Sequence, residues 1–479
     1  MNPRLTSASS VEPRLSSFLT NSIVHNSQVT IMNPTRRDFF KHTAAAGAAL
    51  TIPFVWTGSA ALAQPGRRRK NGLTLAAIGV GGSRSSFFQG TVIATRASQH
   101  ADIIAVCDVD DVHAAEFNAK FDKKLKLYQD YRELLEKEKP DVVTIGTPDH
   151  WHVPIAIAAL RAGCDVYCEK PLTLTIEEGF RIRDAVKETG RVFQVGTQQR
   201  SEENLLFLKA IAIVKSGRLG KRVNAHVGIE GGSVGGPFPT TTPPSDLNWD
   251  MWVGPANQAD YSNERRKEFR WYYDYSGGKM TDWGVHHIDI AQWALGHEQT
   301  GPVKVSGTGK FTPLVPDHFN WQAYFAGEAT LPNGYNTATK FNITLEYADG
   351  SLITVNDHYK SEDGRVDFSN GILFAGENGR IFVNRERLTG KPVEEMTAAD
   401  RAAMYKSLID IYKGRWPGDH MRNFFECIAD RGEPISDVAT HVRTMTCCHL
   451  ANIALMLGRD LNWDPQKERF ISDTQATAL

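Results

Sequence analysis

A short apolar run leads into a glycine-rich turn in the stretch Leu73-Thr74-Leu75-Ala76-Ala77-Ile78-Gly79-Val80-Gly81-Gly82-Ser83-Arg84. A strand followed by such a turn and then a helix lets backbone N–H groups approach a pyrophosphate at the helix N-terminus. The third glycine of the usual G-x-G-x-x-G pattern is replaced by Arg84, which either loosens helix–strand packing or supplies a cation to the phosphate. The stretch predicts the start of a dinucleotide-binding domain, with phosphate contacts from Gly79, Gly81, Gly82, Ser83 and Arg84.

A second apolar run, residues 103–107, ends in an acid, Asp108. An acid at this strand end accepts hydrogen bonds from a ribose 2′-hydroxyl and repels a 2′-phosphate, so the sequence favours NAD over NADP. Its separation from the glycine turn is longer than usual, and an insertion at residues 89–99 in the first crossover explains the difference. The alternative for Asp108 is a solvated strand end with no ligand.

Strands and helices continue to alternate through residues 141–168. This pattern implies right-handed crossovers and a parallel sheet whose ligands bind outside the carboxyl ends of the strands. Two segments that follow such strands, Thr147–His152 and Glu169–Pro171, therefore lie on the cofactor side. His150 and His152 are spaced like a metal pair, but no third ligand follows nearby, so positioning roles are preferred. We assign residues 73–195 to an NAD-binding α/β domain of the Rossmann type.

The pattern changes in residues 196–479, which we assign to a second domain for substrate binding. Longer alternating runs and hairpin signals at residues 347–351 and 376–380 predict a mainly antiparallel sheet. A long insert, residues 231–302, separates the first two strands. Its start, Gly231–Pro244, is rich in Gly, Pro and Thr and predicts a loop that covers a site. Aromatic side chains crowd the insert, where they either stack on a sugar ring or pack in the core.

The insert also carries acids and imidazoles, in the stretch Gly277-Gly278-Lys279-Met280-Thr281-Asp282-Trp283-Gly284-Val285-His286-His287-Ile288-Asp289. A helix that is under way by Asp282 places Asp282, His286, Asp289 and Trp293 on one stripe. His287 lies about 100° round the helix, so only His286 shares the face with both acids. Taken alone, the stretch fits catalysis and a buried helix with a satisfied histidine equally well.

Composition sets outer bounds on the function. At 479 residues the chain is too long for one ordinary core, and two domains are expected. The formal net charge of -1 gives no reason to expect nucleic acid or an anionic membrane as a partner. The six cysteines show no metal-ligand spacing, and no metal site is predicted.

The N-terminal 70 residues resemble an export leader followed by a linker. Thr35-Arg36-Arg37-Asp38-Phe39-Phe40-Lys41 is a twin-arginine signature, followed by a weakly apolar run and the small-residue pattern Ala61-Leu62-Ala63. The run is too short and too rich in alanine for a membrane span, so no span is expected in the mature protein. We expect periplasmic export, cleavage near Ala63, and a translation start at Met32.

Together, ordered motifs across residues 73–465 resemble the Gfo/Idh/MocA family of NAD(P)-dependent oxidoreductases, in particular its exported members. The motifs are the glycine turn, Val106-Cys107-Asp108, Thr147-Pro148 with His152, Glu169-Lys170-Pro171, Gly196-Thr197-Gln198-Gln199-Arg200, Asn248-Trp249-Asp250-Met251-Trp252-Val253-Gly254-Pro255, the stretch 277–289 and the tail 420–465. The resemblance implies a Rossmann domain followed by an α/β domain with an open antiparallel sheet. In relatives this sheet often forms the oligomer interface, so a homodimer or homotetramer is expected.

The resemblance also assigns residues. The family's catalytic lysine matches Lys170, and its aspartate and histidine match Asp282 and His286. Cofactor contacts are expected from Gly79, Gly81, Gly82, Ser83, Arg84, Asp108, Thr147, Pro148, His152, Glu169, Lys170 and Gln198. Substrate contacts are expected from Lys170, Arg200, Trp271, Asp282, His286 and Asp289. The identity of the sugar, polyol or derivative does not carry over.

These residues support a hydride-transfer hypothesis. His286, oriented by Asp282, acts as general base on a substrate hydroxyl, Lys170 stabilises the alkoxide or relays the proton, and hydride passes to the nicotinamide. Because the periplasm has no evident pool of free NAD, the cofactor is expected to be retained and recycled. Recycling takes place through coupled sugar oxidation and reduction, or in a redox-neutral lyase or glycoside cleavage by way of a 3-keto intermediate. A non-catalytic carbohydrate-binding protein and a metal site at His286, His287 and Asp289 are the remaining alternatives.

Overall fold

The first domain is built on β1, residues Thr74–Ile78, whose five side chains are all buried. The computed structural model describes residues 72–82 and 88–479, which belong to one continuous unit of the chain. The leader, Ser83 and Arg84 lie outside the described residues, so the predictions for them stay predictions.

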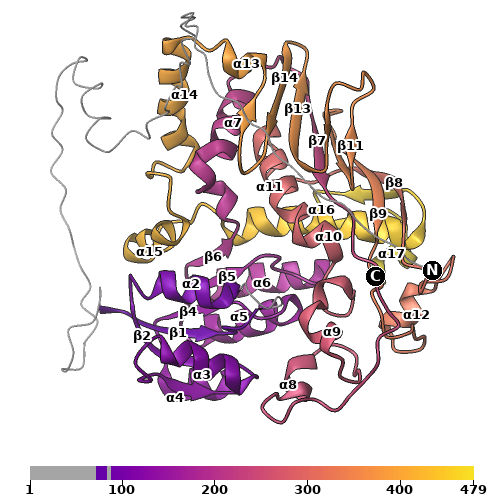
Figure 1. Ribbon diagram of the computed structural model, residues 1–479. Helices are drawn as coiled ribbons and strands as arrows, with labels where there is room; N and C mark the ends of the chain where they lie inside the picture. The colour runs from indigo at the N-terminus through magenta and orange to yellow at the C-terminus, as the bar shows by residue number, and fades with distance from the viewer. Residues whose placement is uncertain (1–71, 83–87) are drawn as a thin grey trace, which may run out of the picture. The chain divides into compact units, whose positions relative to one another are not determined.

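Six parallel strands form the first sheet, in the order β3-β2-β1-β4-β5-β6 (Figure 1). Strands covered on both faces have nearly continuous apolar sequences, and this is why the runs were recognisable as strands. The predicted Rossmann architecture is confirmed. The strands are β1, β2 (Asp102–Cys107), β3 (Lys126–Tyr128), β4 (Val142–Ile145), β5 (Asp165–Glu169) and β6 (Phe193–Gly196). The helices are α2 (Gln89–Ala97), α3 (Asp111–Ala119), α4 (Tyr131–Glu138), α5 (His152–Arg161) and α6 (Ile176–Thr189).

The second sheet has nine strands, in the order β15-β14-β13-β7-β10-β9-β8-β16-β17. Every neighbouring pair is antiparallel except β7 and β10, so the prediction of a mainly antiparallel sheet is confirmed. Its strands are β7 (Val223–Ile229), β8 (Lys304–Lys310), β9 (Lys340–Glu346), β10 (Leu352–Asn356), β13 (Asn370–Gly376), β14 (Gly379–Val383), β15 (Leu388–Thr389), β16 (Leu461–Asp464) and β17 (Arg469–Phe470). A separate hairpin pairs β11 (Tyr359–Lys360) with β12 (Asp367–Phe368).

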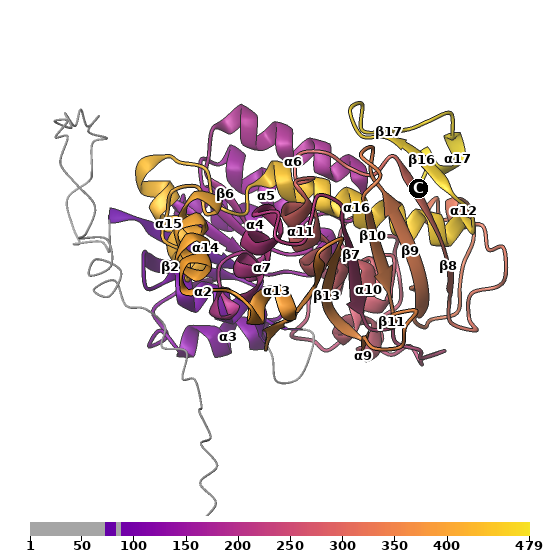
Figure 2. The ribbon, with the colours of Figure 1, turned by 90° about the horizontal axis from the view of Figure 1, so that it is seen from above.

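Helices cover one face of the second sheet (Figure 2). They are α7 (Leu206–Lys215), α11 (Gly284–Leu295) and α16 (Val438–Leu457). Along β9, buried residues alternate with more exposed ones, as expected of an antiparallel strand with one face on the core and one toward solvent. The remaining helices are α8 (Trp249–Val253), α9 (Asn263–Lys267), α10 (Gly278–Asp282), α12 (Trp321–Phe325), α13 (Lys391–Glu394), α14 (Ala398–Ile411), α15 (His420–Asp430) and α17 (Thr474–Thr477).

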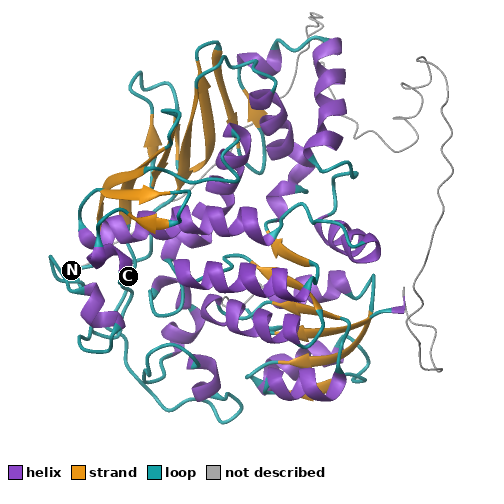
Figure 3. Cartoon of the chain, turned by 180° about the vertical axis from the view of Figure 1, so that it is seen from behind, coloured by secondary structure: helices purple, strands orange, loops and turns teal. Residues whose placement is uncertain are grey.

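The C-terminal helices return to the first domain. Phe424 on α15 packs in one apolar cluster with Leu75 of β1 and Val142 of β4. The N–H of Val195 in β6 donates to the carbonyl of Ser436, just before α16, at 3.0 Å. This is a usual length for such a hydrogen bond. Helices therefore lie between the two sheets (Figure 3), and a single boundary near residue 196 does not capture the part of the tail that contacts both domains.

A buried ion pair connects the end of the first sheet with a helix of the second domain. Arg200, directly after β6, donates to both carboxylate oxygens of Asp289 on α11, at 2.7 and 2.6 Å, and to the carbonyl of Ile435 at 2.7 Å. The two side chains are only 3% and 1% exposed. Burial alone would lower the pKa of Arg200, but the Asp289 carboxylate outweighs burial and raises it. The pair joins the end of the first sheet to the second domain.

Removal of this arginine is expected to destabilise the protein strongly. Arg200→Ala leaves the Asp289 carboxylate buried without its charge partner, which costs about 3–5 kcal/mol of unfolding free energy. The matched control is Arg415→Ala, because Arg415 pairs with Asp430, a carboxylate that is 56% exposed. The control is expected to cost at most about 1 kcal/mol in urea unfolding. Equal losses in the two variants would contradict the structural role of Arg200.

Candidate active site

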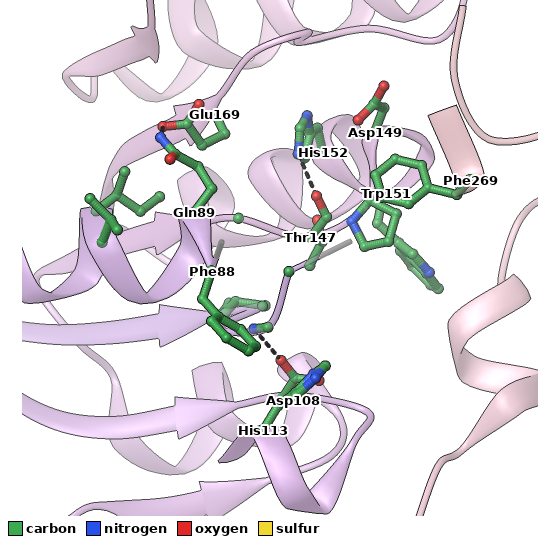
Figure 4. A pocket seen from close by; sticks show the side chains of 18 of the residues that line it. Phe88, Gln89, Asp108, His113, Thr147, Asp149, Trp151, His152, Glu169 and Phe269 are labelled. Carbon is green, nitrogen blue, oxygen red and sulfur yellow. Dashed lines mark hydrogen bonds and ion pairs between the residues drawn. The ribbon is translucent and has the colours of Figure 1, made fainter. Parts of the chain in front are cut away.

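A cavity of about 590 Å³ opens at the carboxyl edge of the parallel sheet. The first domain contributes the glycine turn and the segments after β2, β4 and β5 to its lining (Figure 4). The second domain contributes residues of the insert, including Asp282 of α10 and His286 of α11, and Arg385. The cavity brings together most of the predicted site residues. Those that line it are Gly79, Gly81, Gly82, Asp108, Thr147, Pro148, His152, Glu169, Lys170, Gln198, Asp282 and His286.

The glycine turn lies so close to neighbouring segments that no side chain fits at Gly79 or Gly81. Gly79 has a φ of +73°, and a Cβ there would lie 2.6 Å from the backbone nitrogen of Thr147. A Cβ on Gly81 would lie 2.1 Å from the ring of His113. The hydroxyl of Thr147 is buried and has no hydrogen-bond partner among the described residues. Bare backbone beside an unpaired donor fits a nicotinamide dinucleotide.

Asp108 lies against this turn rather than in open solvent. One carboxylate oxygen accepts hydrogen bonds from the N–H groups of Val80 and Gly81, at 2.9 and 3.1 Å, and the other accepts from the N–H of Asp110 at 3.0 Å. His113 is 3.8 Å away. Burial would lower the pKa of His113, but the Asp108 carboxylate outweighs this and raises it. The acid that is predicted to bind ribose is therefore fixed in place at the cavity wall.

The segments after β4 and β5 are tied together by His152. Its ring nitrogens lie 2.9 Å from the carbonyl oxygen of Thr147 and 2.7 Å from that of Pro171. The positioning role expected of this histidine agrees with its contacts. Glu169 accepts hydrogen bonds from Gln89 and Gln198, at 2.8 and 2.9 Å, and burial raises its pKa.

The stretch 277–289 is two short helices rather than one. The α10 helix ends at Asp282, Trp283 has φ -100° and ψ -33°, and α11 begins at Gly284. The prediction that Asp282, His286, Asp289 and Trp293 share one stripe of a single helix is therefore wrong for Asp282. Among the described residues, no hydrogen bond joins Asp282 to His286, and orientation of His286 by Asp282 is not what the geometry shows.

Asp282 instead binds two cations. Lys170 Nζ donates to the carboxylate of Asp282 at 2.9 Å and to its backbone carbonyl at 2.7 Å. Arg270 Nε donates to the same carboxylate oxygen at 3.3 Å. Burial alone would raise the pKa of Asp282, but Lys170 and then Arg270 outweigh it and hold the pKa well below its usual range. Asp282 is a fixed anion that positions the Lys170 ammonium.

His286 is the imidazole that faces the cavity. It is 4% exposed, and its Nδ1 is buried with no partner among the described residues, which leaves Nε2 as the nitrogen open to the cavity. Burial, then the charges of Lys170 and Arg385, lower its pKa well below the usual value. The ring is therefore neutral near pH 7 and able to accept a proton.

Besides Arg270, two further residues at this end of the cavity were missed in the sequence. Trp283 lines the cavity between Asp282 and His286, and the guanidinium of Arg385 stacks 4.6 Å from its ring. Arg385 comes from the turn between β14 and β15, and its N–H groups donate to the amide oxygen of Gln199 at 3.1 and 3.2 Å. Trp283 could have been found from its place inside the motif, whereas no sequence signal pointed to Arg385.

The structure corrects three of the expected substrate contacts. Arg200 and Asp289 neutralise each other in the interior, and Trp271 is 4% exposed in an aromatic cluster, so none of the three lines the cavity. The loop Gly231–Pro244 does not line it either. The sequence alone does not distinguish a charged or aromatic side chain that is buried in the interior from one that contacts a ligand.

Other features concern metals and membranes. Among the described residues, no group of three or more His, Cys, Asp or Glu side chains is placed to hold a metal ion. The six cysteines are buried and unpaired with one another. No helix in residues 72–82 or 88–479 has the length and apolar character needed to cross a bilayer.

Two family models match the chain along its two domains. Residues 73–197 match the oxidoreductase family with an NAD-binding Rossmann fold, and residues 231–311 match the C-terminal alpha/beta domain of the same family. Both matched regions of the chain belong to the Gfo/Idh/MocA oxidoreductase family. The first domain is an NAD-binding Rossmann domain, which agrees with the glycine turn and with the fixed acid at the end of β2.

Individual relatives match the chain at low sequence identity or over only part of its length. Inositol 2-dehydrogenase of Salmonella typhimurium is 32% identical over 126 residues, which are 26% of this chain and 37% of that protein, so the chain spans well under half the length of this relative. D-glucoside 3-dehydrogenase of Escherichia coli is 25% identical over 309 residues, 60% of this chain and 75% of that protein. The WlbA dehydrogenase structure from Bordetella pertussis, solved with NADH and UDP-GlcNAcA, has a TM-score of 0.54 at 18% identity and covers 82% of this chain and 99% of its own.

Neutralising the acid after β2 is expected to weaken cofactor selection. Asp108→Asn keeps the size of the side chain but removes its charge, so NAD is expected to bind about 10–100-fold more weakly, as loss of a charged hydrogen bond implies. Discrimination against NADP is expected to fall as well, since the anion no longer repels a 2′-phosphate. Calorimetric titration with each dinucleotide measures both effects. Unchanged NAD affinity in this variant would rule out Asp108 as the ribose partner.

Proposed function

We propose that this protein oxidises a hydroxyl group of a sugar, polyol or glycoside, with NAD as hydride acceptor. The observation that carries the proposal is the shared cavity, in which a dinucleotide-binding turn and the Lys170, Asp282 and His286 side chains face one space. The names of the relatives point the same way, since an inositol 2-dehydrogenase and a D-glucoside 3-dehydrogenase both act on a carbon that bears a hydroxyl.

Lys170 is proposed to bind the reacting oxygen. An ammonium has three N–H donors, and two of them are directed to the carbonyl and the carboxylate of Asp282. Among the described residues no hydrogen bond uses the third donor, which is therefore available to the substrate oxygen. A charge held in this way stabilises an alkoxide at little cost in reorganisation.

His286 is proposed to take the hydroxyl proton at Nε2. The ring is neutral near pH 7, because burial and the neighbouring cations lower its pKa. When bound, NAD supplies the acceptor for the hydride that leaves the same carbon. Asp282 contributes by fixing Lys170, and this replaces the role that the sequence gave it.

We further propose that the cofactor is retained through many turnovers. The support is the leader, whose paired Arg36 and Arg37 and Ala61-Leu62-Ala63 pattern indicate export to the periplasm, where a pool of free NAD is not expected. Similarity to a D-glucoside 3-dehydrogenase favours oxidation at a ring hydroxyl. A redox-neutral reaction that passes through a 3-keto sugar is therefore the second candidate function.

Assembly into a homodimer or homotetramer is also proposed, through the second sheet. The support is the set of exposed side chains of Lys340, Asn342 and Glu346, which alternate along β9 with buried ones, in a sheet that has helices over one face (Figure 2). Light scattering of the full chain tests it, and cell fractionation tests export.

Exchange of either reacting group is expected to stop chemistry but not cofactor binding. Lys170→Met and His286→Gln should each lower turnover by about 10²–10⁴-fold, the usual contribution of such groups. His287→Gln is the matched control, because His287 contacts Gln199 and Asn370 and does not line the cavity. Turnover is measured at the reduced-nicotinamide absorbance over a panel of sugars and glycosides, and NAD content by mass analysis. Wild-type rates in either variant, or a control as impaired as His286→Gln, would overturn these roles.

The loss of activity on the acid side of the pH profile is expected to occur at a lower pH than is usual for a histidine base. A base works when deprotonated, and the pKa of His286 is lowered by burial and by Lys170 and Arg385, so activity should persist until the pH falls well below about 6.5. Arg385→Gln removes one of these cations and should move this loss to a higher pH. The profile of kcat/KM against pH measures both. Loss of wild-type activity at or above pH 6.5 would contradict the assignment of His286 as base.

A further inference from the structure

We propose that residues 246–254 form a strap across the nucleotide cleft, from the segment after β2 over the glycine turn to the segment after β4, and hold NAD in place between turnovers. The inference rests on the proposed function, since it assumes that NAD binds along the glycine turn. The strap includes most of the Asn248–Pro255 motif, whose role the chemistry of the site does not explain. Two anchors, one on each side of the turn, carry the inference.

The first anchor lies just after β2, beside the acid that is predicted to bind ribose. The N–H of Asn248 donates to the carbonyl of Val109 and the N–H of Asp111 donates to the carbonyl of Asp246, each at 2.9 Å. Between these bonds Asp110 and Leu247 form an antiparallel bridge. The strap is therefore paired by its backbone to the segment that follows Asp108.

The second anchor lies just after β4. The indole N–H of Trp151 lies 3.0 Å from the carbonyl oxygens of Met251 and Trp252, and Nε2 of His150 donates to the Trp252 carbonyl at 3.0 Å. At Gly254 the strap passes so close to Trp151 that a Cβ would lie 2.0 Å from the indole ring. Only glycine fits there, which accounts for this position of the motif.

The strap crosses the nucleotide cleft, because of the strand order. The β2 and β4 strands pair with β1 on its two sides, and β1 ends at the glycine turn. A segment anchored after β2 and again after β4 must pass over the end of β1. Leu247, Met251 and Trp252 of the strap line the same cavity as Gly79 and Gly81 of the turn. A dinucleotide on the turn therefore lies between the sheet and the strap.

The strap packs against a buried aromatic cluster of the second domain. Trp249 stacks on Trp252 at 4.7 Å between ring centroids, and Trp252 meets the edge of Tyr275 at 4.9 Å, within one buried aromatic cluster. From α9, Arg266 donates to the carboxylate of Asp110 and adds a charged contact across the cleft. Both α8 and α9 extend from the second domain alongside the first (Figure 1). Release of NAD then requires the two anchors to separate.

A reversible lock tests the strap within a single variant. In an antiparallel bridge flanked by its hydrogen bonds, the facing Cα atoms lie about 4.5 Å apart, which suits a disulfide. The variant D110C/L247C is loaded with NAD, and exchange against isotope-labelled NAD is followed by mass spectrometry with and without reductant. Oxidation is expected to slow exchange by about tenfold or more, because the chain at the first anchor is then covalently closed. Exchange that is equally fast in the two redox states overturns the strap.

Opening the anchors is expected to have the opposite effect. Trp151→Phe removes the indole N–H and Arg266→Ala removes the charged contact, and each should speed NAD exchange by about 3–10-fold, as loss of one hydrogen bond implies. Arg459→Ala is the matched control, because Arg459 pairs with Asp473 and neither residue lines the cavity. A merely structural contact would lower the melting temperature and leave the exchange rate unchanged, and that result would overturn the inference. Protein that binds no NAD at all would overturn the proposed function itself.

Discussion

The ion pair between Lys170 and Asp282 is the point at which the two domains become one site. Lys170 follows β5 of the parallel sheet and Asp282 ends α10 of the second domain, so the 2.9 Å contact exists only when both domains are folded and packed together. The pair fixes the ammonium beside the cavity, and that ammonium is one cause of the lowered pKa of His286. Separation of the domains would remove the oxygen-binding group and alter the base at once.

The same packing imposes a second constraint on the cofactor. The Arg200–Asp289 pair and the tail helices connect the two domains, and the segment 246–254 connects them again beside the glycine turn. If the proposed strap holds, a dinucleotide bound between these connections exchanges slowly. Retained NAD suits an enzyme that reoxidises its cofactor on its own substrate and suits poorly one that draws on a free pool.

The architecture was predictable because buried parallel strands have apolar sequences that end in short polar motifs. Those motifs also predicted that Lys170, Asp282 and His286 would face the glycine turn. The sequence could not show that Asp282 binds Lys170 rather than His286, because the break at Trp283 depends on tertiary packing. It could not show that Arg200 and Asp289 pair with each other in the interior and do not contact a ligand. Nor could it supply Arg385, which reaches the cavity from a turn about one hundred residues downstream.

The most direct measurement is the path of one hydrogen atom. The holoprotein is incubated with a glucoside that carries deuterium on its ring carbons, quenched within the first turnover, and its nicotinamide cofactor is extracted for mass spectrometry. Hydride transfer at this cavity predicts one deuterium on the nicotinamide ring, whether the overall reaction is a net oxidation or is redox-neutral. Formation of product with no deuterium on the cofactor would contradict the proposed chemistry.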